Sequence, residues 1–123
     1  CERVRGAGRI PLPFLAEMEV RNALRVLHGR NQVSSEELAC ALSLLDSDIR
    51  EGRLVRVSPA PAKVATTAER LSRHHAPATL CRTLDLLHVA IAQNLGKLLF
   101  HTGDRRQADL ARKAGLEVVS MDL

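Results

Sequence analysis

The chain has 123 residues, of which 46% are apolar, and this is enough for one compact domain with a core of its own. Lys and Arg outnumber Asp and Glu by 18 to 14, and the net charge of +4 is compatible with a nucleic acid or an acidic partner protein. The only aromatic residues are Phe14 and Phe100, which argues against a base-stacking platform, and no apolar run is long enough for a membrane-spanning helix.

A short strand and a helix are predicted first. Residues 9–14 (RIPLPF) suit an edge strand, because their prolines cannot donate hydrogen bonds within a sheet. Residues 15–28 repeat apolar side chains at helical spacing, and 29–31 (GRN) ends this helix. The expected apolar arc consists of Ala16, Val20, Ala23, Leu24 and Leu27. The expected polar face consists of Glu17, Arg21, Arg25 and His28.

A second helix and a second strand follow. Ser34 or Ser35 before two glutamates is a helix-start signal, and the helix is expected to continue to about Glu51 and to stop at Gly52. Residues 54–59 (LVRVSP) alternate between apolar and polar side chains, which predicts a strand.

Two more helices are predicted in the middle of the chain, with a loop between them. The third helix begins its apolar pattern at Val64 and ends near His74, and 74–79 (HHAPAT) is typical of a loop. Thr83 is expected to cap the fourth helix, and Gly96 is expected to end it.

The last part of the chain predicts a strand, a helix and a strand. Residues 97–102 (KLLFHT) suit a buried strand, a helix follows to Ala114, and 116–121 (LEVVSM) suits a short final strand. Because strands and helices alternate, we expect an α/β fold with a mostly parallel central sheet, in a single domain over residues 1–123.

Asp85 is the most unusual acid of the chain. It lies in RTLDLLHVAIA (82–92), where apolar residues surround it in the predicted fourth helix. A carboxylate is costly to bury unless it has a partner. The structural alternative is that Asp85 complements the helix dipole, as acids often do in a first turn.

Two other acids also occupy informative positions. Glu19 lies between Ala23 and Val26 on the wheel of the first helix, inside or at the edge of the apolar arc, whereas Glu17 is expected to be a solvated surface charge. Asp104 follows the strand 97–102, and ligand sites in parallel α/β sheets lie at the carboxyl ends of strands. The structural alternatives are an ion pair for Glu19 and a helix N-cap for Asp104.

Three acids on separate elements suggest a site for a hard cation. Mg²⁺ and Mn²⁺ prefer carboxylate and water oxygens, and such an ion can activate water and neutralise charge at a phosphodiester. Four nearby residues are candidates for holding substrate or supporting the site, with a solvated surface as the alternative for the arginines. These are Thr102, Arg82, Arg105 and Arg106.

Three segments resemble a known family: LAEMEVRNALR, then RTLDLLHVAIA, then LFHTGDRRQADLARKAGLEV. In this order they resemble the PIN-domain nucleases, in particular the VapC-type toxins of type II toxin–antitoxin pairs. The resemblance covers about residues 11 to 119 and implies a three-layer PIN-like fold. It implies that Glu19, Asp85 and Asp104 are catalytic metal-binding residues for Mg²⁺ or Mn²⁺ in an endoribonuclease.

The chain departs from the family pattern at its start. Such proteins usually open with a strand that carries an Asp, in a pattern like LDTS, followed by a helix, and CERVRGAGRIP contains neither. We therefore expect an N-terminally truncated PIN-like domain without its first strand–helix unit and its first metal-binding Asp. We expect the chain in this form to be inactive or poorly folded by itself.

The resemblance also implies partners, and it leaves alternatives open. It implies an RNA substrate, a homodimer and a cognate VapB-like antitoxin, and the three widely spaced cysteines fit a reduced cytoplasm. The main alternative is a non-catalytic or degenerate PIN-fold interaction domain. A small nucleotide-binding α/β domain is a weaker alternative, because the chain has no glycine-rich phosphate loop.

Overall fold

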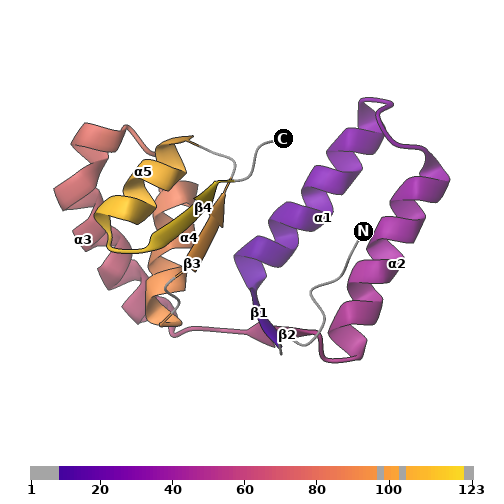
Figure 1. Cartoon of the computed structure of the whole chain (residues 1–123), viewed down its shortest axis with the longest axis horizontal. Coiled ribbons are helices and arrows are strands. Elements are labelled where there is room, and N and C mark those ends of the chain that lie inside the picture. The colour runs from indigo at the N-terminus through magenta and orange to yellow at the C-terminus, as the bar shows by residue number, and fades with distance from the viewer. Residues whose placement is uncertain (1–8, 97–98, 103–104, 121–123) are drawn as a thin grey trace. The chain divides into compact units, whose positions relative to one another are not determined.

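The computed structural model describes residues 9–96, 99–102 and 105–120 (Figure 1). Contacts within the chain divide it into two compact units, Cys1–Ser58 and Pro59–Leu123. Within the described residues, both units combine helices with a pair of parallel strands.

The first unit is a helical hairpin joined to a strand pair. Its elements are β1 (Ile10–Pro13), α1 (Phe14–Gly29), α2 (Ser35–Arg50) and β2 (Leu54–Val57). α1 and α2 lie side by side, and β1 pairs with β2 in parallel (Figure 1). The strand predicted at 9–14 is confirmed.

A capping box starts α2. The Ser34 side chain accepts a hydrogen bond from the backbone N–H of Glu37 at 3.0 Å, and the Glu37 carboxylate accepts one from the backbone N–H of Ser34 at 2.9 Å. This reciprocal pair satisfies two of the donors that a helix start leaves open. It makes Ser34, rather than Ser35, the capping residue.

The first unit buries little of its apolar surface. Leu12 is buried, whereas no described residue of α1 or α2 is. The predicted arc of α1 is wrong in part, because Val20 and Ala23 are exposed while Glu17 and Arg21 from the expected polar face are half-buried. Ion pairs, rather than apolar contacts, account for the partial burial of that side of the helix.

The second unit holds the larger core. Its elements are α3 (Pro61–Thr79), α4 (Thr83–Asn94), β3 (Leu99–Thr102), α5 (Arg105–Lys113) and β4 (Glu117–Ser120). β3 pairs with β4 in parallel, the three helices pack against one another, and α5 packs against this strand pair (Figure 1). The core is built from Val64, Leu71, Leu86, Val89, Ala90, Leu110, Ala111 and Leu116.

Two local predictions in this unit are wrong. Residues 74–79 are not a loop but the last turns of α3, which contains Pro77. Pro77 cannot donate a backbone hydrogen bond to the carbonyl four residues earlier, yet the helix continues to Thr79, whose hydroxyl donates to the His75 carbonyl at 3.0 Å. The N-cap of α4 is Arg82, with extended backbone, and Thr83 is the first helical residue.

The α/β fold class is confirmed, and both strand pairs are parallel as predicted. The described strands form two pairs of four-residue strands, β1 with β2 and β3 with β4. Gly96 follows α4 with a φ of 69°, the left-handed conformation expected of a glycine after a helix. No helix in the described part of the chain combines the length and the apolar character needed to cross a membrane.

Candidate functional site

Asp85 lies in the first turn of α4, the helix that carries much of the core of the second unit. Its carboxylate oxygen Oδ2 accepts a hydrogen bond from the backbone N–H of Arg82 at 2.9 Å. Asp85 thereby satisfies a backbone donor that the start of the helix leaves open. The residue is half-buried, while Leu86 and Val89 beside it are buried. Asp85 therefore lies in the first turn, as its structural alternative, a complement to the helix dipole, requires.

Capping leaves part of the Asp85 carboxylate available. A carboxylate offers two oxygens with about four acceptor positions, and the backbone N–H uses one of them. The other oxygen, Oδ1, has no hydrogen-bond donor among the described residues. The cap fixes the direction of the side chain and leaves a hard oxygen that suits Mg²⁺ or Mn²⁺.

Glu19 lies on α1 in the first unit and is exposed. The prediction that it lies inside or at the edge of the apolar arc is wrong, because Ala23 and Val26, between which it lies, are themselves exposed. An exposed carboxylate can bind a cation, but its setting gives no evidence of a buried charge in need of a partner.

The grouping of the three predicted acids stays a prediction. Asp104 lies outside the described residues, and Glu19 and Asp85 belong to different units. Thr102 ends β3, and its side chain also lies outside the described part of the chain. In the ranges 9–96, 99–102 and 105–120, no group of three or more His, Cys, Asp or Glu side chains could hold a metal ion.

Glu17 contradicts its prediction as a solvated surface charge. Its side chain is 15% exposed and forms ion pairs with Arg21 at 3.1 Å and with Arg56 at 2.9 Å. Arg21 in turn pairs with Asp46 of α2 at 2.6 Å. The spacing of Glu17 and Arg21, four residues apart on one helix, was a signal for the first of these contacts.

This network joins three elements of the first unit and shifts its charges. Two hydrogen bonds from Arg56 are the main reason that the pKa of Glu17 lies below its ordinary value of 4.5; burial opposes them, and Arg21 adds to them. The hydrogen bond to Asp46 is the main reason that the pKa of Arg21 is raised. Glu17 is thus ionised and already bound, which makes it a structural acid.

Exposed arginines lie at the start of two helices in the second unit. Arg82 precedes α4, and Arg105 and Arg106 lie in the first turn of α5. That turn contains no acid. The amino end of a helix carries partial positive charge, so cations there oppose the dipole. Two arginines at this position do not help the helix, and they are available to hold an anion such as a phosphate.

The comparisons with known proteins place the chain in a family. No match was found among curated proteins or among solved structures. The family model described as "PIN domain" matches residues 2–113, which is most of the chain. PIN domains are generally nucleases that bind RNA and use divalent metals. The chain therefore belongs to the PIN-domain family.

Proposed function

We propose that this protein is a metal-dependent endoribonuclease of the VapC toxin type, which hydrolyses RNA phosphodiester bonds. The match of the PIN model to residues 2–113 is the observation that carries this proposal. The resemblance of RTLDLLHVAIA and LFHTGDRRQADLARKAGLEV to VapC-type toxins supports the narrower assignment.

Glu19, Asp85 and Asp104 are proposed to hold Mg²⁺ or Mn²⁺, directly or through water. The donor chemistry fits, because hard cations prefer carboxylate oxygens, and Asp85 presents a carboxylate that its helix cap has already oriented. The ion would supply charge neutralisation at the phosphodiester and activation of water.

The chain's own residues supply binding and orientation. Asp85 is held by the Arg82 backbone at one oxygen, so its carboxylate cannot rotate freely. Arg105 and Arg106 are proposed to hold the RNA backbone, since guanidinium groups form charge-assisted hydrogen bonds with phosphate. Few aromatic residues are present, so binding would depend on phosphates more than on stacking.

The toxin assignment includes three further proposals: a cognate VapB-like antitoxin, a homodimer and a cytoplasmic location. Each depends on the VapC resemblance. Growth arrest on expression without the antitoxin tests the first of them, and the apparent mass in solution tests the second.

The deciding experiment measures cleavage of a structured RNA by the full-length protein with Mg²⁺ or Mn²⁺. Asp85→Asn should lower the rate by at least about 100-fold, because a ligand loses more than the 10–100-fold typical of supporting residues. The matched control is Asp109→Asn, an exposed acid of α5 whose described ion pair is with Arg112. It should cleave like the wild type.

Two outcomes would count against the proposal. If Asp85→Asn cleaves as fast as the wild type, the metal-site assignment is wrong. If the wild type binds RNA but cleaves none with either metal, the non-catalytic interaction domain is the better description.

A further inference from the structure

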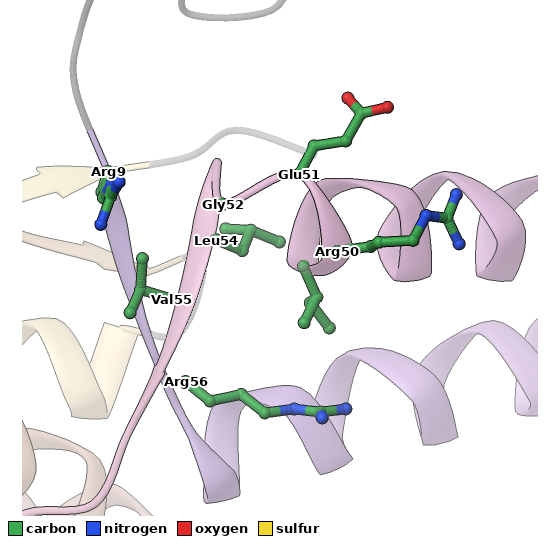
Figure 2. Close-up of a pocket in the computed structure, with 8 residues that line it drawn as sticks. Arg9, Arg50, Glu51, Gly52, Leu54, Val55 and Arg56 are labelled. Atoms are coloured by element: carbon green, nitrogen blue, oxygen red, sulfur yellow. The ribbon is translucent and has the colours of Figure 1, made fainter.

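An open pocket of about 420 Å³ lies in the first unit, where α2 ends and β1 and β2 begin. Three arginines line it: Arg9, Arg50 and Arg56. Figure 2 shows Arg9 on the β1 side and Arg50 at the end of α2, with Leu54 and Val55 between them. The pocket therefore combines positive charge with apolar surface.

The backbone brings these residues to one place. The N–H of Ile10 donates to the carbonyl of Arg53 at 2.9 Å, which places Arg9 beside the start of β2. Gly52, with a φ of 80°, turns the chain from α2 into β2 and keeps Arg50 at the pocket. This left-handed conformation favours glycine, so the turn itself helps to define the site.

The charge of the pocket is only partly neutralised. Glu51, the one acid among the described lining residues, forms an ion pair with Arg53, and Arg56 is paired with Glu17 of α1. Arg9 and Arg50 are exposed and make no ion pair with any side chain in the described ranges. Two guanidinium groups without an acidic partner among the described residues thus border the pocket.

The residues around Arg9 and Arg50 indicate which kind of ligand the pocket suits. Arg50 complements the dipole at the end of α2, whereas Arg9 precedes β1 and lies at no helix end in the described part of the chain. Between them the pocket is lined by the half-buried apolar side chains of Ile49, Leu54 and Val55. Such a surface fits an anion with a less polar body, as in a nucleotide phosphate with its ribose and base.

The volume of the pocket and its lining residues indicate more closely which class of ligand it suits. A volume of about 420 Å³ lies near the lower end of the range for ligand pockets, ~300–1000 Å³. This suits one nucleotide of a single strand better than a duplex. The described lining residues include no aromatic side chain, so recognition would depend on the phosphate and not on stacking with the base.

We propose that this pocket is a phosphate-binding subsite for single-stranded RNA, in which Arg9 and Arg50, which lie on opposite sides of Leu54 and Val55 in Figure 2, each contact the RNA backbone. The inference rests on the proposed function, because it concerns the RNA on which that function acts. The pocket lies at the amino ends of β1 and β2, whereas ligand sites for chemistry in parallel sheets lie at the carboxyl ends. It therefore holds RNA away from the bond to be cleaved.

The test measures the affinity of the full-length protein for a fluorescein-labelled, unstructured single-stranded RNA by fluorescence anisotropy. EDTA is present, so that no cleavage occurs. Arg9→Gln with Arg50→Gln should weaken binding by about 10-fold. It should also reduce the slope of log affinity against log salt by about 0.7 for each phosphate that the variant no longer holds.

The matched control is Arg25→Gln with Arg30→Gln. Both of these arginines are exposed, neither makes an ion pair with a described side chain, and the change in net charge is the same. This control should weaken binding by less than about 3-fold. Circular dichroism checks that all variants fold, and Arg9→Lys with Arg50→Lys should keep the salt slope because it keeps the charge.

The outcomes separate this inference from the proposed nuclease activity. Equal reductions in affinity for the two glutamine pairs, or no reduction for the pocket pair, would overturn the subsite. An equal reduction with a duplex probe would overturn its preference for single strands. If the pocket pair binds more weakly while the wild type never cleaves RNA with added metal, the subsite stands and the nuclease proposal fails.

Discussion

Glu17 links the sequence of the first unit to its stability through a single carboxylate. It accepts hydrogen bonds from Arg21 on its own helix and from Arg56 on β2, and Arg21 extends the network to Asp46 of α2. Arg56 is 62% exposed, so water weakens that interaction, whereas Glu17 is mostly covered. Most of the stabilisation should therefore depend on Glu17.

Glu17→Gln should lower the free energy of unfolding by about 1 kcal/mol at pH 7, the upper end of the range for exposed ion pairs. The pKa of Glu17 is lower in the folded protein than its ordinary value of 4.5, so the stabilisation is complete above 4.5 and is lost as the pH falls through the folded pKa. The difference between variant and wild type should shrink accordingly in acid. Urea unfolding at pH 7 and below 4.5 measures both effects.

Glu69→Gln is the control for this prediction. Glu69 pairs with Arg73 four residues away, but both side chains are about 70% exposed, at 68% and 70%. Its replacement should change the urea midpoint little at either pH. Equal urea midpoints for wild type and Glu17→Gln at pH 7 would show that the network contributes nothing.

Three acids, Asp85, Glu17 and Glu19, show where sequence reasoning about the site succeeds and where it fails. The capping position of Asp85 is a local property, so the apolar pattern around it and its place in the first turn were readable from the sequence. The helical wheel misjudged Glu17 and Glu19, because it ranks faces by hydrophobicity. It has no means of detecting Arg56, which lies 39 residues from Glu17.

At the scale of elements, the capping box of α2 offers a clean test of a local rule. The sequence left Ser34 and Ser35 as alternatives, and the structure selects Ser34, whose side chain accepts from Glu37. Ser34→Ala should lower the free energy of unfolding by about 1 kcal/mol, the typical cost of removing a cap. Ser35→Ala, at the first helical position, should cost much less, and similar urea midpoints for the two variants would contradict the assignment.

Helices and strands were predictable to within a few residues where their signals are local. Periodicity placed α1, α2 and α5, and the prolines of residues 9–14 correctly marked a short edge strand. The segment 74–79 failed because histidine, proline and threonine together are typical of a loop. There the packing of α3 against α4 and α5 keeps the helix going, and such long-range contacts cannot be read from one segment.

Across the chain as a whole, net charge is unevenly divided between the two units. Residues 1–58 contain nine Lys and Arg against eight Asp and Glu, whereas 59–123 contain nine against six. The second unit therefore carries most of the net charge of +4. For an RNA-binding protein this predicts that affinity falls as salt rises, and that side chains of the second unit contribute to the slope.

The two ends of α5 allow charge and helix stability to be separated within one element. Arg105→Gln with Arg106→Gln removes cations that oppose the helix dipole, so stability should stay the same or rise by a few tenths of a kcal/mol. RNA affinity should fall, and the salt slope should decrease by about 0.7 for each phosphate that the variant no longer holds. Thermal unfolding and anisotropy with single-stranded RNA in EDTA measure the two effects.

Arg112→Gln with Lys113→Gln makes the same change in charge at the other end of α5. There cations favour the dipole, so stability should fall by a few tenths of a kcal/mol while RNA affinity changes less than for the first pair. If both pairs weaken RNA binding equally, only total charge matters, and Arg105 and Arg106 have no particular role. Opposite effects on stability and affinity would mean that the first turn of α5 gives up helix stability for binding to phosphate, as expected of residues placed for function.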